Sequence, residues 1–264
     1  MHKAWQLICP FAEEMTTPLP PPPLDPASAL FVDVDGTLLE IAPDPKAVQV
    51  PPHLPELLRA LEARHGGAFA LVSGRAIAAL DRLFAPWQAA AAGLHGGERR
   101  RSDGSRADID PGIASAALER IRPAAAEFAA DLSGVRIEDK GGTLALHYRS
   151  TPERAAAVER FAQEAVAAGQ GALRQLAGKM VIELVPRGFD KGRAIAAFLA
   201  EPPFCGRRPV FLGDDVTDEE GFAEIERRGG VAIRVGPPTT ATAAAFALPD
   251  VDAALAWLSG AAPG

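Results

Sequence analysis

The 264-residue sequence predicts an α/β fold, a parallel sheet with crossover helices into which a smaller α+β unit is inserted. Short apolar runs alternate with stretches of helical periodicity near both ends of the chain, which is typical of strands joined by crossover helices. Between them the order changes to helix, hairpin, helix, hairpin, which indicates a small antiparallel sheet with two helices on one face. We therefore expect a core of residues 25–100 and 188–264 and an inserted domain of residues 101–187.

Composition limits the possible partners. Apolar residues make up 48% and charged residues 23%, as in ordinary soluble proteins, and the net charge of −7 argues against binding to nucleic acid. Cys9 and Cys205 are far apart and in no C-x-x-C pattern, so a reducing compartment is the simpler interpretation. Because no apolar run reaches membrane-spanning length and no signal peptide is evident, we expect a cytoplasmic protein with no membrane or nucleic-acid partner. We also expect a monomer.

The first 24 residues end in a cluster of prolines. Residues 18–23 contain five prolines and one leucine. Proline-rich segments adopt extended or polyproline geometry without a core of their own. We expect residues 1–24 to be a leader outside the fold, a passive tail rather than a docking peptide.

The first strand, residues 29–32, runs directly into Asp33-Val34-Asp35-Gly36-Thr37. Side chains two residues apart in a strand point the same way, so the carboxylates of Asp33 and Asp35 converge. At about 4 Å and an effective dielectric constant of about 20 they would repel by about 4 kcal/mol, a cost that a divalent cation removes. Gly36 permits a sharp turn, and Thr37 offers a hydroxyl and an amide to an anion. The alternative is an ordinary strand end followed by an Asp-Gly turn.

The next elements repeat the strand and helix alternation. Leucine spacing predicts a helix over 54–63, closed by two glycines, and then a buried strand over 68–72 that ends in Ser73-Gly74-Arg75. A helix over 76–84 and a strand over 89–94 follow. The Ser73 hydroxyl and the adjacent amides suit a phosphate oxygen, although serine is also a common helix cap.

The inserted unit begins after a polar, turn-rich stretch at 99–106. We expect a helix over 113–131, with a break at Pro123 as an open alternative. Two hairpins follow, with strands at 135–138 and 144–148 and at 172–176 and 180–185. A helix over 152–168 separates them.

The parallel pattern returns at residue 191. We expect helices over 191–200 and 218–228, strands over 209–212 and 231–235, and helical material up to residue 258. Asp190 suits the N-cap of the first helix, which places Lys191 where the helix dipole favours an anion. A lysine at this position is unfavourable unless an anion binds beside it, so Lys191 indicates anion binding. The alternative is a solvated surface lysine.

A second group of acids follows the strand at 209–212. Asp214, Asp215 and Asp218 lie within five residues, whereas a helix cap needs only one. We expect these acids to share a hard cation with Asp33. Magnesium prefers such an oxygen-rich, partly hydrated site.

Taken in order, Asp33-Val-Asp35-Gly-Thr, Ser73, Lys191 and Gly213-Asp-Asp-Val-Thr-Asp218 resemble the four motifs of the haloacid-dehalogenase-like phosphohydrolases. The insert resembles the C2-type cap found on the Rossmann-like core of that superfamily. Over residues 28–260 the chain is similar to the trehalose-6-phosphate phosphatases. That likeness rests on Leu94-His-Gly-Gly-Glu98, Glu138-Asp-Lys-Gly-Gly142, Leu146-His-Tyr148, Gly178-Lys-Met-Val-Ile-Glu183 and Asp190-Lys-Gly192.

The resemblance implies a Mg²⁺-dependent phosphatase that hydrolyses trehalose 6-phosphate through an aspartyl-phosphate intermediate. Asp33 would be the nucleophile and a metal ligand, and Asp35 the acid and base, with its backbone carbonyl on the metal. Asp214 would complete the metal site, supported by Asp215 and Asp218. Ser73 and Lys191 would hold the phosphoryl oxygens.

Groups in the insert would recognise the sugar. The candidates in the inserted hairpins are Glu138, Lys140, Lys179 and Glu183, and further substrate-binding candidates in the core are Thr37, Arg75 and His95. Each hairpin residue could instead be an exposed strand residue without a partner, although Glu183 lies in an otherwise apolar strand.

Two other functions stay open. One is a phosphatase for sucrose 6-phosphate or for several hexose phosphates. The other is a catalytically silent regulatory module, which the intact pair of acids in the first motif disfavours.

Overall fold

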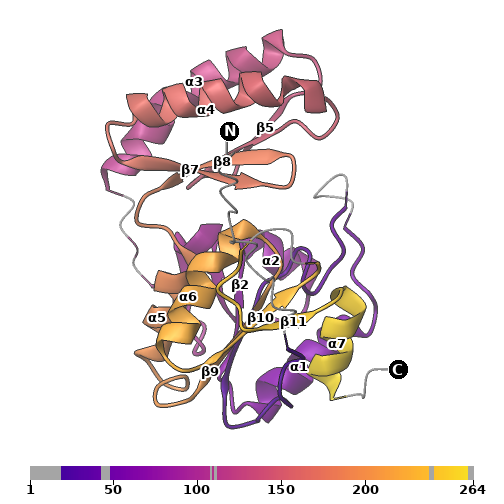
Figure 1. The fold of residues 1–264 in the computed structure, drawn as a ribbon. Helices are drawn as coiled ribbons and strands as arrows, with labels where there is room; N and C mark the ends of the chain where they lie inside the picture. Colours follow the sequence, from indigo (N-terminus) through magenta and orange to yellow (C-terminus); the bar gives the residue numbers. More distant parts are fainter. Residues whose placement is uncertain (1–18, 43–47, 108, 110–111, 238–240, 261–264) are drawn as a thin grey trace, which may run out of the picture.

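The structure is a computed structural model that describes residues 19–42, 48–107, 109, 112–237 and 241–260. An α/β core carries a smaller α+β unit over one end (Figure 1). The core sheet has the strand order β11-β10-β9-β1-β2-β3-β4. Its strands are β1 (Ala29–Val32), β2 (Phe69–Val72), β3 (Ala90–Gly93), β4 (Glu98–Arg100), β9 (Pro209–Gly213), β10 (Val231–Val235) and β11 (Phe246–Leu248). All neighbours pair in parallel except β3 and β4, so the predicted α/β fold class is confirmed.

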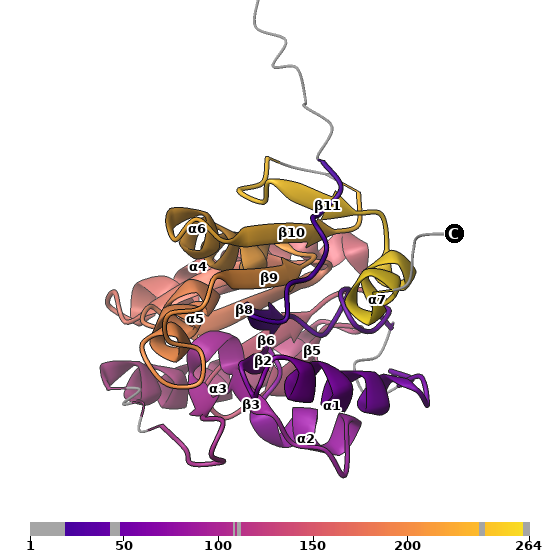
Figure 2. The ribbon, with the colours of Figure 1, turned by 90° about the horizontal axis from the view of Figure 1, so that it is seen from below.

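Helices cover both faces of this sheet (Figure 2). One face carries α1 (Leu54–Arg64), α2 (Ile77–Leu83) and α7 (Val251–Ser259), and the other carries α5 (Lys191–Leu199) and α6 (Glu219–Arg227). Strand β1 shows why its sequence is continuously apolar. Leu30 and Val32 pack into the cluster of the first face, and Ala29 and Phe31 into that of the second. Polar side chains can therefore gather only beyond the strand ends.

The inserted unit has its own sheet and its own buried cluster. Antiparallel strands β5 (Arg136–Asp139), β6 (Leu144–His147), β8 (Val181–Pro186) and β7 (Leu173–Gly178) lie side by side in that order. Helices α3 (Ile113–Asp131) and α4 (Ala155–Ala168) cover the face that points away from the core (Figure 1). Helix α3 continues through Pro123, so the alternative of a broken helix is wrong. The division of the chain at residues 101 and 187 stays a prediction.

Two short edge strands were not predicted. The closing segment contains β11 before α7, where only helical material was expected. The polar stretch at residue 99 begins within β4, whose arginines are buried because Arg99 pairs with Glu201 and Arg100 with Asp81. Both strands have only three residues, too few to show a periodicity.

The expectation that residues 1–24 lie outside the fold is wrong for residues 19–24, which we call the N-terminal strap. The Ala247 amide donates to the Leu19 carbonyl at 3.1 Å, and Trp257 Nε1 donates to the Pro22 carbonyl at 3.0 Å. Leu24 is buried in the core. A proline-rich strand keeps its carbonyls available as acceptors, which lets it bind along β11 and α7. Residues 1–18 lie outside the described residues.

In the part of the chain that the structure describes, no helix combines the length and the apolar character needed to cross a membrane.

Deletion of residues 1–24 should lower the free energy of unfolding by about 2 to 4 kcal/mol, because it removes the buried Leu24 side chain and leaves Trp257 Nε1 without its acceptor. Deletion of residues 1–18 alone is the control and should change stability little. Urea titrations followed by circular dichroism measure both variants. Equal stability of the two truncated proteins would mean that the strap contributes nothing.

Candidate functional site

A pocket of about 780 Å³ lies between the carboxyl ends of the core strands and the open face of the inserted sheet. The core contributes Asp33, Asp35, Ser73, Arg75, His95, Lys191, Asp214 and Asp215 to its lining, and the insert contributes Glu138, Lys140, His147, Arg149, Lys179 and Glu183. Most of the residues predicted from the sequence therefore share one cavity. Thr37 and Asp218 lie next to it and are fully buried.

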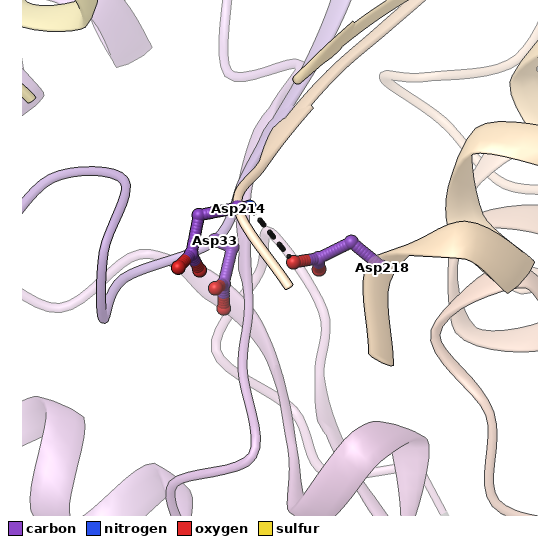
Figure 3. Close-up of side chains that lie close together, drawn as sticks. All are labelled: Asp33, Asp214 and Asp218. Carbon is purple, nitrogen blue, oxygen red and sulfur yellow. Dashed lines mark hydrogen bonds between the residues drawn. The ribbon is translucent and has the colours of Figure 1, made fainter. Parts of the chain in front are cut away.

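An acidic cluster forms one end of the pocket. Strands β1 and β9 are parallel neighbours with Val32 opposite Leu212, so the residues after both strands emerge at the same edge. The carboxylates of Asp33 and Asp214 lie side by side there, and Asp218 approaches from the short 3₁₀ helix η4 (Val216–Asp218) (Figure 3). One oxygen of each lies within 4.8 Å of the others, and all three residues are at least 95% buried. Acids from distant parts of the chain thus meet in one buried space.

The turn after β1 leaves room for this cluster. Gly36 has φ of +80°, and a Cβ atom at this position would lie 2.1 Å from Asp214 Oδ2. Glycine is therefore required both for the backbone conformation and for the approach of the second acid.

Lys191 provides the positive charge inside the cluster. Its Nζ atom lies 2.6 Å from Asp218 Oδ1 and 3.0 Å from Asp33 Oδ1, and only 2% of the residue is exposed. Asp190 caps α5 by accepting from the Arg193 amide, as predicted, which places Lys191 at the helix start. Burial opposes the charged form, but Asp218 and Asp33 raise the pKa of Lys191 above its ordinary value. A solvated surface lysine, the alternative interpretation, is wrong.

The donor set fits a divalent cation. Burial raises the pKa of Asp33 well above its ordinary value against the opposing Lys191 charge, and Asp218 and Asp214 add to the rise. Burial and the Asp218 carboxylate raise the pKa of Asp214 to about 6. Negative charge is thus in excess, and carboxylate oxygens are the ligands that Mg²⁺ prefers.

Two acids that we grouped with the metal site make other contacts. The Asp35 carboxylate receives hydrogen bonds from Nε and Nη2 of Arg75, both at 2.6 Å. Asp215 Oδ1 accepts from the Val216 amide, and Asp215 and Asp218 form a capping box on η4. Geometry therefore gathers Asp218 rather than Asp215 with Asp33. The expected role of the Asp35 carbonyl stays a prediction.

The predicted phosphate-binding hydroxyls are both buried. Ser73 lines the pocket, and its Oγ accepts a hydrogen bond from the Arg75 amide at 3.1 Å. Within the described residues, Thr37 Oγ1 has no hydrogen-bond partner. Ser73 thus stabilises the turn at residues 73–75 as a hydrogen-bond acceptor, and its hydroxyl hydrogen can still be donated to a ligand.

At the other end of the pocket, Glu183 is the centre of a hydrogen-bond network. Its carboxylate accepts from Lys140 Nζ at 3.0 Å and from Thr143 Oγ1 at 2.5 Å, and His95 Nε2 lies 3.2 Å away. Burial acts to raise the pKa of Glu183, but Lys140 and His95 lower it well below its ordinary value. Glu183 is 8% exposed, so it is not an exposed strand residue without a partner. An ionised carboxylate here can accept hydrogen bonds from hydroxyl groups.

Cationic side chains of the insert also reach the core directly. Lys140 Nζ donates to the Gly74 carbonyl at 3.1 Å, and Lys179 Nζ donates to Asp214 Oδ2 at 2.7 Å. Arg149 donates to the carbonyl of Ala42 in the core at 2.8 Å, and within the insert it donates to the carbonyl of Lys179 at 3.0 Å. These contacts close the insert over the pocket.

Sequence reasoning missed Thr143 and Arg149 at this end, and it quoted His147 in the Leu146-His-Tyr148 motif without giving it a role. Their roles depend on contacts between strands and between domains: Thr143 binds Glu183, and His147 donates to Glu138 at 2.9 Å. The alternation of side chains along the strand at 144–148, continued by one residue at each end, could have indicated that these three residues share a face. It could not have indicated which groups that face meets.

A family model described as trehalose-phosphatase matches residues 31–252, which is most of the chain. The chain belongs to the trehalose-phosphatase family. It is 45% identical over 227 residues to a protein of Sinorhizobium fredii named "Probable trehalose-phosphate phosphatase", covering 85% of this chain and 84% of that one. It is 43% identical over 248 residues to the trehalose-6-phosphate phosphatase of Escherichia coli, with 92% and 90% covered.

A solved structure shares the fold of this family member. The C-terminal domain of the trehalose-6-phosphate phosphatase of C. albicans superposes with a TM-score of 0.78 at 22% identity, covering 92% of this chain and 99% of that one. At this identity the likeness concerns the fold alone. It extends over core and insert together.

Asp218→Asn should destabilise the protein by about 2 to 4 kcal/mol, because an amide would turn a donor toward Lys191 Nζ and remove a buried charge. Asp215→Asn is the matched control and should cost less than about 1 kcal/mol, since its cap is partly exposed. Thermal and urea unfolding measure the difference. Similar losses in both variants would contradict the buried network as described.

Proposed function

We propose that the protein hydrolyses trehalose 6-phosphate to trehalose and phosphate, with Mg²⁺ and through an aspartyl phosphate on Asp33. One observation carries the proposal: a single pocket joins a buried cluster of acids and Lys191 to a polar network around Glu183. The first end suits a phosphoryl group, and the second suits sugar hydroxyls. The names of the two bacterial relatives agree with this substrate.

In the proposed first step Asp33 attacks phosphorus, a bond forms between its carboxylate oxygen and phosphorus, and the bond from phosphorus to the sugar oxygen breaks. For this step Asp35 has to be protonated and released from Arg75, and it then gives that proton to the departing sugar oxygen. In the second step Asp35 takes a proton from water, which attacks phosphorus and releases Asp33 and inorganic phosphate. Arg75 holds the Asp35 carboxylate at the pocket wall with two hydrogen bonds before substrate arrives.

Asp33, Asp214 and the Asp35 carbonyl would hold the Mg²⁺ ion, which when bound supplies positive charge for the phosphoryl oxygens. Asp218 would support these ligands, because its carboxylate accepts hydrogen bonds from Lys191 and from the amides of Asp214 and Asp215. Lys191, Ser73 and the Thr37 hydroxyl would bind the remaining phosphoryl oxygens.

Glu183 and Lys140 would bind the sugar, with Glu138 held by His147 beside them. The pocket volume of about 780 Å³ leaves room for a disaccharide phosphate, since ligand pockets usually measure about 300–1,000 Å³. His95 supports Glu183 and so would act on the sugar indirectly. The closed insert would also keep water from the intermediate until the sugar leaves.

The monomeric state and the cytoplasmic location belong to the same proposal. The location rests on the two cysteines, which are far apart in the sequence, and on the ordinary composition, and the monomeric state stays a prediction.

Phosphate release from a panel of sugar phosphates tests the function. Trehalose 6-phosphate should be hydrolysed at least about 100-fold faster, as kcat/KM, than sucrose 6-phosphate or glucose 6-phosphate, because only the matched disaccharide satisfies the buried network. EDTA and Asp33→Asn should each abolish release. Equal rates across the panel would point to a broad hexose phosphatase, and no release from any substrate would favour the silent regulatory module.

Glu183→Gln should lower kcat/KM for trehalose 6-phosphate by about 10- to 100-fold, because a charged acceptor for hydroxyl groups and for Lys140 is lost. Hydrolysis of p-nitrophenyl phosphate, which is too short to reach Glu183, should change by less than about threefold. Glu159→Gln, an exposed acid on α4, is the matched control. Equal losses on both substrates would show that Glu183 supports the fold rather than sugar recognition.

A further inference from the structure

Lys179 makes an unusual contact for a residue of the insert. It lies at the tip of the β7–β8 hairpin and reaches across the pocket to Asp214 Oδ2 at 2.7 Å. Its side chain is 54% exposed, whereas that of Asp214 is 4% exposed. A half-exposed cation thus neutralises a buried acid of the proposed metal site.

The backbone around Lys179 is held by contacts to its neighbours, whereas the side chain is half exposed. Arg149 donates to the Lys179 carbonyl, and the Tyr148 amide donates to the Met180 carbonyl at 3.1 Å. Gly178 packs so closely on η4 that a Cβ atom there would lie 3.3 Å from Asp215 Oδ2. The four-carbon stem of Lys179 has rotatable bonds, so its ammonium group can change position while the hairpin backbone keeps its contacts.

The charges of the cluster favour a cation of higher charge. With all three carboxylates counted as ionised, they face two ammonium groups, those of Lys191 and Lys179, and one negative charge is left over. A divalent cation in place of the Lys179 ammonium would bring the cluster to neutrality. If both cations used Asp214 Oδ2, they would lie at most about 4.8 Å apart, since Mg²⁺ binds oxygen at about 2.1 Å. At that distance in a buried site the two cations repel strongly.

We propose that Lys179 is a built-in counter-ion that competes with Mg²⁺ for Asp214. Metal binding displaces its ammonium from Asp214 into the pocket, where it can meet the anionic substrate. The inference rests on the proposed function for the identity of the metal. It adds that the insert, through one lysine, sets how tightly the core holds its cation.

The test is a calorimetric titration of Mg²⁺ into the full chain without substrate. Lys179→Met removes the ammonium and keeps most of the stem, so it should bind Mg²⁺ about tenfold more tightly than the unaltered protein. Lys140→Met is the matched control. It removes the same charge from the same sheet, but Lys140 contacts Glu183 and Gly74 rather than the acidic cluster, so its affinity for Mg²⁺ should change by less than about twofold.

A second measurement separates this effect from damage to the fold. Without metal, Lys179→Met should have a lower Tm than the unaltered protein, and saturating Mg²⁺ should raise its Tm by more. An unchanged or weaker affinity in Lys179→Met would overturn the competition, and if Mg²⁺-dependent phosphate release persisted, the proposed function would still stand. Equal tightening in both lysine variants would overturn it as well, because it would show a general effect of charge. Absence of Mg²⁺ binding to every variant would overturn the competition together with the metal assignment.

Discussion

The rest of the structure depends on the excess of negative charge where β1 and β9 end. Two buried carboxylates at about 4 Å repel by about 4 kcal/mol at an effective dielectric constant of about 20, and this site holds three, close together. The pairing of Val32 with Leu212 sets Asp33 and Asp214 side by side and leaves them little freedom to separate. The cluster exists because a sheet buried on both faces holds the acids where an isolated segment would let them part.

Core and insert divide this charge between them. The core supplies the acids and one buried cation, Lys191, and the insert supplies cations that cross to the core, including Lys140 and Lys179. The insert that covers the pocket therefore also brings positive charge to it. A phosphorylated sugar, anionic at one end and rich in hydroxyls at the other, complements both halves.

Sequence patterns could predict those helices, strands and caps that are determined by neighbouring residues in the chain. The apolar runs before Asp33 and Asp214 predicted two central strands, and the N-cap at Asp190 placed Lys191 correctly. They could not predict features that depend on packing between distant segments. The binding of Thr143 to Glu183 depends on the register of β6 and β8, and the strap depends on acceptors offered to α7 and β11.

Asp215 and Asp218 show that sequence patterns cannot distinguish even two nearby acids whose contacts differ. Both are aspartates within five residues of the end of the same strand, so the sequence alone gives no reason to assign them different roles. The 3₁₀ turn separates them: it points the Asp218 carboxylate back to the amides of Asp214 and Asp215, and leaves Asp215 to cap the turn from outside. Gly213 permits this return, because a Cβ atom there would lie 2.4 Å from Asp218 Cγ. The Asp218 carboxylate thus also holds the loop that carries Asp214 and keeps Lys191 against Asp33, contacts that the sequence alone does not reveal.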